Sequence, residues 1–305
     1  MRKHIVGLFL LFAILLLDLS PAEAEWSLSA LSERFGSTLV KVMALDDKDR
    51  VTAFGSGFFL NDRGAFATNY HVLENASRAI VRAKGGEEGE VIEITHADPN
   101  LDLLIAVSSF SNSLPASLGD SDTLRVGERV IVMGNSPGQA GTLSSGTVTH
   151  LRKAGDLTLI QMSAPLLPGW SGGPVFNFSG EVIGIATAYL DFAHFAMPAN
   201  RLKTLKAHPS KVNNLRGSSV KLAASLVNNT LAELLVKQGV SPQPEKPTVA
   251  TPGPHPPLTV YFKDGKKLLC DWVWKDEKTL FLVVQGRSFA VGYDLDLIDL
   301  KRSLL

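Results

Sequence analysis

The chain has 305 residues, of which 45% are hydrophobic, so it is long enough to build two or three domains with sizeable cores. Lys plus Arg and Asp plus Glu both number 30, which gives a formal net charge of zero. A chain this neutral has no overall electrostatic attraction to nucleic acid or to an anionic membrane, and we expect neither as a partner. The one cysteine, Cys270, excludes an internal disulfide framework.

Residues 1–24 have the pattern of a secretion signal peptide. A basic start precedes the apolar run 5–17, and residues 22–24 (Ala-Glu-Ala) form a small-x-small cleavage site. The 13 apolar residues fall short of the roughly 20 that cross a bilayer. We expect cleavage before Glu25, with no integral membrane segment afterwards. An exported chain without disulfides suits a bacterial periplasm or exterior.

The sequence predicts an all-β domain over residues 25–207, with helices only at its edges, at 28–35 and 198–207. Turn residues at 111–122 divide the strands into two sets of about six, which predicts two barrels at about 36–120 and 121–197. The predicted strands, rich in β-branched and aromatic residues, are 38–44, 57–60, 65–68, 78–83, 89–97, 103–107, 129–133, 141–151, 157–162 and 181–188.

The organisation changes beyond residue 207. Leucines at near-helical spacing predict a helix over 222–239. Seven prolines among the sixteen residues 242–257 predict an extended spacer. Residues 258–305 then form a separate small module, predicted as an SH3-like or Sm-like barrel, and any partner of this module is expected to be a protein. Its strands are predicted at 258–263, 268–274, 279–285 and 288–292.

Trp272 and Trp274 lie two residues apart in this module, so their side chains share one face of a strand. We interpret them as the core of a small module in preference to a peptide-binding patch.

Three residues supply the parts needed for nucleophilic catalysis. A serine hydroxyl is a weak nucleophile at neutral pH, so a neutral imidazole must accept its proton, and a carboxylate must hold that imidazole in the right tautomer. Ser171, His71 and Asp102 are the candidates, in the chain order His, Asp, Ser. Flanking glycines permit the tight backbone path that aims N–H groups at a developing oxyanion. The expected donors are the N–H groups of Gly169 and Ser171.

Two neighbouring residues compete with these candidates. Asp98 could orient the imidazole in place of Asp102, but it precedes a proline, where capping a turn is its ordinary role. Asp102 directly precedes the apolar run 103–107, which would anchor its carboxylate in the interior. Ser56 also lies between glycines, and we interpret it as a turn serine.

Seven ordered motifs stand out in the central segment, namely residues 55–58 (GSGF), 68–72 (TNYHV), 102–105 (DLLI), 134–138 (GNSPG), 145–148 (SGTV), 169–174 (GWSGGP) and 195–198 (FAMP). As a set they resemble the landmarks of trypsin-like serine proteases of the Deg/HtrA type, over roughly residues 26 to 207. The resemblance implies two six-stranded β-barrels with the triad in the cleft between them. It also implies that Ala186, Thr187 and Ala188 lie at the edge that pairs with a substrate backbone.

The chain departs from this family in two places. Trp170 stands where the family usually has Asn or Asp, which argues against activation by a freed amino terminus and leaves open whether the oxyanion loop is ordered at rest. The C-terminal module has neither the carboxylate-binding loop nor the length of a PDZ domain, so family properties that depend on PDZ domains are not carried over.

Such a site is expected to prefer substrates with an apolar side chain in its pocket. No acidic residue lies just before Gly169 to select Lys or Arg, whereas Leu166, Leu167 and Phe195 suggest a pocket for small or medium aliphatic side chains. His194 could instead recognise an acidic side chain, although a surface-loop histidine is its ordinary interpretation.

Other classes of site fit the residues less well. The pattern Gly-x-Ser-x-Gly at 169–173 also matches α/β-hydrolases. Their nucleophile elbow needs a strand before the first glycine and a helix after the serine, and prolines at 165, 168 and 174 oppose both.

No metal or cofactor is expected. The histidines are scattered along the chain, and residues 134–141 lack the lysine of a phosphate-binding loop.

The expected function is therefore a secreted or periplasmic serine endopeptidase that hydrolyses unfolded or damaged proteins through an acyl-enzyme intermediate. A catalytically silent, protease-like binding scaffold of the cell envelope is the alternative, with Trp170 disabling the oxyanion loop.

Overall fold

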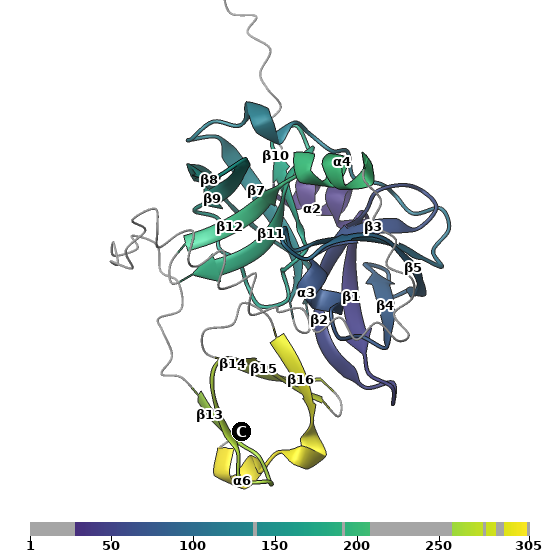
Figure 1. Ribbon diagram of the computed structural model, residues 1–305, viewed down its shortest axis with the longest axis vertical. Coiled ribbons are helices and arrows are strands. Elements are labelled where there is room, and N and C mark those ends of the chain that lie inside the picture. The colour runs from purple at the N-terminus through teal and green to yellow at the C-terminus, as the bar shows by residue number, and fades with distance from the viewer. Residues whose placement is uncertain are drawn as a thin grey trace, which may run out of the picture.

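A computed structural model describes residues 28–136, 139–190, 193–207, 258–276, 279–284 and 290–303 (Figure 1). The predicted signal peptide, the helix over 222–239 and the Pro-rich spacer all lie outside these ranges. Within them, no helix is both long and apolar enough to cross a membrane.

Six antiparallel strands form the first barrel in the order β1-β4-β5-β6-β3-β2, and the pairing of β1 with β2 closes it. Side chains alternate between core and solvent along β4, where Ala79 and Val81 are buried and Arg82 is exposed. The short helix α3 (Tyr70–Leu73) follows β3. The strands are β1 (Leu39–Leu45), β2 (Val51–Phe59), β3 (Ala65–Thr68), β4 (Arg78–Ala83), β5 (Glu88–Asp98) and β6 (Leu103–Ser108).

Six further antiparallel strands close the second barrel in the order β10-β11-β12-β9-β8-β7. The all-β, two-barrel prediction is therefore confirmed. The helices at the edges of the domain are α2 (Leu28–Gly36) and α4 (Asn200–Ala207), with the 3-10 turn η1 (Ser121–Thr123) between the barrels. The strands are β7 (Arg129–Ser136), β8 (Gln139–Ala154), β9 (Leu157–Met162), β10 (Pro174–Asn177), β11 (Val182–Leu190) and β12 (Ala193–Pro198).

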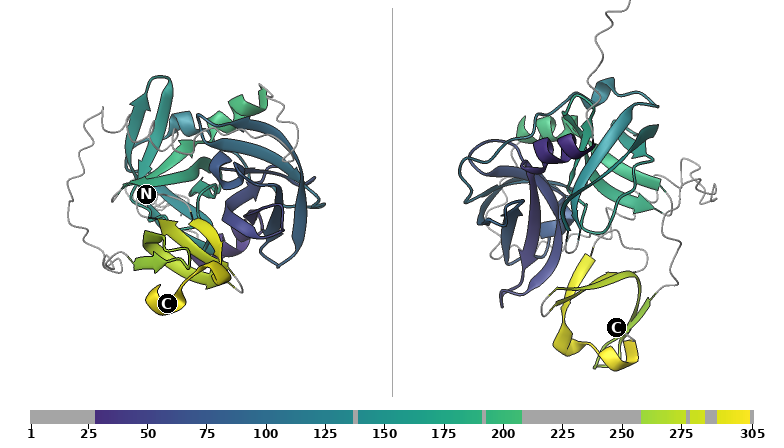
Figure 2. Two further views of the ribbon diagram at one scale, coloured as in Figure 1. Left: turned by 60° about the horizontal axis from the view of Figure 1, so that its bottom comes forward. Right: turned by 180° about the vertical axis from the view of Figure 1, so that it is seen from behind.

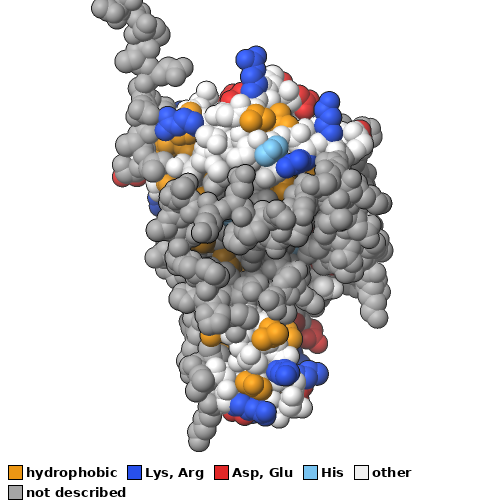
Figure 3. Space-filling model, turned by 90° about the vertical axis from the view of Figure 1, so that its left-hand side faces the viewer, with side chains coloured by type: hydrophobic (Ala, Val, Ile, Leu, Met, Phe, Trp, Pro, Cys, Tyr) orange, Lys and Arg blue, Asp and Glu red, His pale blue; other side chains and the backbone are white. Residues whose placement is uncertain are grey.

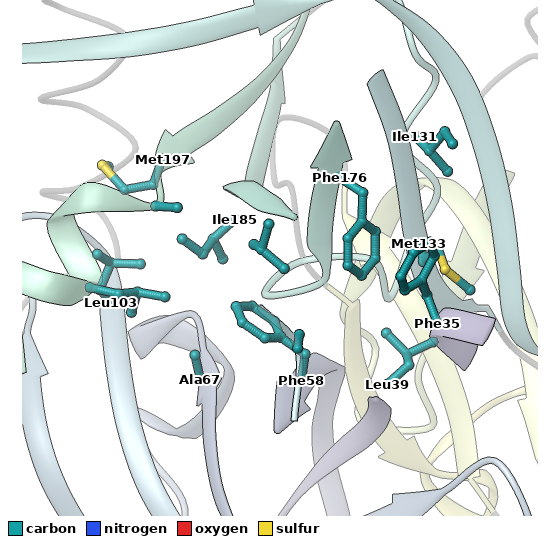
Figure 4. Packing of buried hydrophobic residues seen from close by; sticks show 14 of the residues in the cluster. Phe35, Leu39, Phe58, Ala67, Leu103, Ile131, Met133, Phe176, Ile185 and Met197 are labelled. Atoms are coloured by element: carbon teal, nitrogen blue, oxygen red, sulfur yellow. The ribbon is translucent and has the colours of Figure 1, made fainter. Parts of the chain in front are cut away.

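One apolar core joins the two barrels (Figure 4). Phe58 and Leu103 of the first barrel pack in the same buried cluster as Ile185 and Met197 of the second. Helix α2 contributes Phe35, whose ring stacks on Phe176 with 4.7 Å between ring centroids. Because protein interiors are close-packed, this shared core fixes the barrels relative to each other and positions the loops between them.

The C-terminal module is an antiparallel sheet in the order β16-β15-β14-β13, followed by η2 (Leu295–Leu297) and α6 (Leu300–Ser303). No pairing of β13 with β16 is seen in the described part of this module, so its closure into a small barrel stays a prediction, as does the role of the two tryptophans. The strands are β13 (Leu258–Tyr261), β14 (Lys267–Asp276), β15 (Thr279–Val284) and β16 (Ala290–Asp294).

This module is not isolated from the barrels. Strand β16 pairs antiparallel with β2 of the first barrel, which extends the barrel sheet to ten strands. Figures 1 and 2 show the module beside the first barrel, with β16 nearest to it. On the face shown in Figure 3, acidic and basic side chains occur on both the barrels and the module, as the balanced composition implies.

Candidate active site

His71 and Asp102 meet through two hydrogen bonds. The Nδ1 atom of His71 lies 2.7 Å from Asp102 Oδ2, and the backbone N–H of His71 donates to Oδ1 at 2.9 Å. Both side chains are nearly buried, with exposed fractions of 8% and 3%. A carboxylate that holds Nδ1–H and the backbone together fixes the ring, and it directs Nε2 to the side away from Asp102.

Asp102 lies in the turn between β5 and β6 with a φ of 53°, a left-handed conformation that Asp tolerates better than most residues. Its carbonyl accepts a hydrogen bond from Asn69 Nδ2 at 2.8 Å, and its Oδ2 accepts one from Thr187 Oγ1 at 2.9 Å. Thr187 belongs to the second barrel, so this carboxylate ties the two barrels together at the site.

Asp98, the competing carboxylate, faces its own turn. Its Oδ1 accepts hydrogen bonds from the backbone N–H groups of Asn100 at 2.9 Å and Leu101 at 3.2 Å. It therefore caps the turn, as expected, and its Oδ1 holds the backbone that leads into Asp102.

Ser171 lies in a loop between β9 and β10 that depends on glycines at two positions. Gly169 and Gly172 have φ values of 88° and 85°. A Cβ on Gly169 would lie 2.3 Å from Phe54 Cε2, and one on Gly172 would lie 2.2 Å from the carbonyl oxygen of Ser56. Only glycine combines these backbone angles with such close approach. Because β10, and not a helix, follows Ser171, the loop is no α/β-hydrolase elbow.

Ser56 was expected in a turn, and this prediction is wrong. It lies inside β2, fully buried. Its Oγ donates to the carbonyl of Gly169 at 2.7 Å and accepts from the N–H of Asn135 at 2.8 Å, and its own N–H donates to the carbonyl of Ser171 at 2.8 Å. Glycines on both sides are required here by close approach instead of by a turn, because a Cβ on Gly55 would lie 2.8 Å from that Ser171 carbonyl.

Trp170 is an interior residue of the second barrel. Only 1% of it is exposed, and its indole N–H donates to Ser136 Oγ at 2.8 Å. Its ring fills the space beside Gly134, where a Cβ would lie 2.3 Å from Trp170 Cγ. Packing and one side-chain hydrogen bond therefore hold this residue in place, at the position where the family resemblance leads us to expect Asn or Asp.

The three residues expected to meet a substrate backbone lie on β11. Ala186 exchanges hydrogen bonds with the nucleophile loop, accepting from Gly172 N–H at 2.7 Å and donating to the Gly173 carbonyl at 2.9 Å. Thr187 donates to Asp102, as described above. Ala188 follows on the same strand. Because the N–H of Ala186 donates to Gly173, it is not free to bind a substrate backbone.

The three expected pocket residues differ in access. Leu167 is 38% exposed and Leu166 is 9% exposed, whereas Phe195 is fully buried in the core between the barrels. Because it is buried, Phe195 would not contact a substrate directly and would only shape the wall behind the pocket.

His194 lies on β12 and not in a surface loop, so that interpretation is wrong. Its Nδ1 accepts a hydrogen bond from the Leu166 N–H at 3.3 Å, and burial lowers the pKa of His194 to about 4. A neutral imidazole at physiological pH offers no positive charge to an acidic side chain.

No group of three or more potential metal ligands occurs in the part of the chain that the structure describes. The local chemistry is instead that of a nucleophile, an imidazole and a buried carboxylate.

Comparison with known proteins agrees with this geometry. Residues 55–185 match a family model described as a trypsin-like peptidase domain. Among solved structures, the crystal structure of Deg5 superposes with a TM-score of 0.52 at 28% identity, covering 58% of this chain and 90% of Deg5.

Two curated relatives are named as serine proteases. The periplasmic serine endoprotease DegP of Escherichia coli (strain K12) is 31% identical over 201 residues, which is 62% of this chain and 42% of DegP. The probable serine protease do-like of Buchnera aphidicola subsp. Acyrthosiphon pisum (strain APS) is 33% identical over 203 residues, which is 62% of this chain and 42% of that protein. This chain thus spans less than half the length of these relatives.

Proposed function

We infer that this chain, which carries a trypsin-like peptidase domain over residues 55–185, is a serine endopeptidase. The observation that carries the inference is the pair of hydrogen bonds from His71 to Asp102, made in a buried site beside the glycine-bounded loop of Ser171. A carboxylate that grips both the ring and the backbone of a histidine is arranged for acid–base catalysis.

The proposed reaction proceeds through an acyl-enzyme. Ser171 Oγ attacks the scissile carbonyl while His71 Nε2 takes its proton, and Asp102 stabilises the imidazolium that forms. The N–H groups of Gly169 and Ser171 stabilise the oxyanion of the tetrahedral intermediate. His71 then gives its proton to the leaving amine. In the second half of the reaction, a water molecule attacks the ester while His71 takes its proton, and His71 then returns a proton to Ser171.

The proposed substrates are unfolded or damaged polypeptides outside the cytoplasm. Three observations support them: the export pattern of residues 1–24, the names of the curated relatives, and the strand β11 at 187–188, which would bind an extended backbone by sequence-independent hydrogen bonds. Leu167 would contact the side chain before the cleaved bond. We propose residues 25–207 as the catalytic part and 258–305 as a separate module.

Hydrolysis of casein, an unfolded model protein, tests the function. Residues 25–305 should release peptides, and the Ser171→Ala variant should lose this activity by about 10⁴-fold or more. Ser179→Ala is the matched control because Ser179 is an exposed serine of the same barrel. If neither the parent nor Ser171→Ala cleaves casein while both remain folded and bind it, the chain is a binding scaffold instead.

A further inference from the structure

We propose that the edge of β2 at Ala53 and Phe54 is a strand-addition site that β16 shares with the substrate. β16 occupies it in the free protein, and the part of an extended polypeptide that follows the scissile bond, here called the leaving arm, displaces β16 to reach Ser171. This inference rests on the proposed function, and it assigns the surface that would bind the substrate after the scissile bond.

Alternation along β2 shows which groups face this edge. The Phe59 N–H donates to the Thr38 carbonyl, just before β1, whereas the N–H groups of Leu60 and Ser56 donate to Ala65 and Ser171 on the opposite side. Backbone groups two residues apart in a strand point the same way. The N–H and C=O of Phe54 therefore face the same edge as those of Ser56, away from β1.

Strand β16 lies on this edge next to the nucleophile. Ala290 is the direct partner of Phe54, and Val291 is the partner of Ala53. Phe54 is two residues from Ser56, which binds the carbonyl of Ser171. Two residues of a strand span about 7 Å. Along one edge of β2, the chain thus places first β16, then the nucleophile loop, and then β3.

The leaving arm of a substrate is directed to this edge. Leu167 and strand β11 at 187–188 lie on the second barrel, so the arm before the scissile bond would bind there. The arm after the bond then passes to the other side of Ser171, over the first barrel. Phe54 lies on the first barrel beside the nucleophile loop, because a Cβ on Gly169 would lie 2.3 Å from its ring.

The pairing of β16 with β2 is short enough to be displaced. It joins two residue pairs, whereas β15 is paired with β14 over its whole length within the module. An incoming polypeptide offers the same backbone donors and acceptors as β16, so the exchange conserves hydrogen bonds.

A reversible cross-link tests the competition. In an antiparallel ladder, hydrogen-bonded and non-hydrogen-bonded pairs alternate, so Ala53 and Val291 form a non-hydrogen-bonded pair with Cα atoms about 4.5 Å apart, within disulfide range. The double variant Ala53→Cys and Val291→Cys would be assayed oxidised and then reduced. The single variants serve as controls, and Cys270 is retained because it is buried.

Two peptides separate the possible results. One extends on both sides of the scissile bond, and the other ends at that bond in a small chromogenic amide. We expect oxidation to lower cleavage of the first by at least about tenfold, to change hydrolysis of the second by less than about twofold, and reduction to restore both. Equal retention of both activities, equal loss of both, or failure of the thiols to link would overturn the proposal.

A binding measurement keeps this test separate from the proposed function. In a Ser171→Ala background, the two-sided peptide should slow formation of the cross-link, and the one-sided peptide should not. Slower linking without any cleavage by the parent would support strand competition while refuting the endopeptidase. An unchanged rate of linking, in a protein that cleaves casein, would refute the competition alone.

Discussion

The two halves of the candidate site are held by different physical means. The base half, on the first barrel, depends on hydrogen bonds that converge on the carboxylate and the carbonyl of one residue, Asp102. The nucleophile half depends on close packing, with glycines at 134, 169 and 172 leaving space for Trp170, Phe54 and the backbone of β2. The base half should therefore respond to a change of charge and the nucleophile half to a change of volume.

Asp102→Asn should have the largest effect on activity. Asn also tolerates a positive φ, so the backbone should survive while the carboxylate that fixes the His71 tautomer is lost. We expect kcat to fall about 10⁴-fold with little change in KM. Steady-state kinetics on a short peptide would measure this, alongside Asp98→Asn, which should retain most activity because Asp98 faces its own turn.

Gly134→Ala should damage the nucleophile half through volume alone. The added methyl group would lie 2.3 Å from Trp170 Cγ, so the ring must move and carry the neighbouring Ser171 with it. We expect a loss of about 10²- to 10³-fold in kcat, as when an oxyanion donor is removed, and a destabilisation of about 1–3 kcal/mol.

Two further variants decide whether volume is the cause. Gly85→Ala is the control, since its Cβ would meet nothing within 4 Å and the variant should match the parent. Trp170→Leu in the Gly134→Ala background should recover part of the activity. No recovery would mean that the loop is not controlled by this packing.

Ser56→Ala should have a smaller effect, through a residue that positions the loop without touching substrate. It removes the hydrogen bond to the Gly169 carbonyl and leaves the Asn135 N–H without its partner. We expect kcat to fall by about tenfold and the free energy of unfolding by about 1–3 kcal/mol. Ser108→Ala, another buried serine with one carbonyl partner, should lose stability but not kcat. Equal effects on kcat would assign Ser56 a purely structural role.

His194→Gln should leave activity at pH 7 almost unchanged and should alter the dependence of stability on pH. Because burial lowers the pKa of His194 to about 4, the unfolded chain binds a proton at this position near pH 6.5 and the folded chain does not. Stability should therefore fall as the pH drops from about 6.5 to about 4, by up to roughly 3 kcal/mol. Urea unfolding across this range should show a smaller fall in the variant. Parallel curves would contradict the assignment.

Local pattern in the sequence was sufficient to predict most strands. The predicted ranges 65–68, 78–83 and 157–162 coincide with β3, β4 and β9, because β-branched runs there end at turn residues. The start of β2 was predicted six residues late, since Ala53, Gly55 and Ser56 have weak strand propensity. Pairing with β1 decides their conformation, and that pairing is a tertiary contact.

The candidate triad could be predicted because its residues lie in compact motifs. The roles of Ser56 and Trp170 could not, since both depend on distant partners: Ser56 binds Gly169, and Trp170 fills the space beside Gly134. For Ser56, the sequence offered one signal, a glycine on each side, and this pattern is typical both of a turn and of close packing. The pairing of β16 with β2 uses backbone groups that every sequence has, so no motif could reveal it.

Residues 208–257 connect the barrels to the C-terminal module, so β16 and β2 are parts of one molecule. A pairing within one chain has an effective concentration that is set by the connection and does not fall when the protein is diluted. Occupancy of the β2 edge by β16 is therefore independent of how much of the protein is present. If the edge is shared as proposed, only the amount of extended polypeptide outside the molecule can change that occupancy, and the protein's activity follows the load of unfolded chains around it.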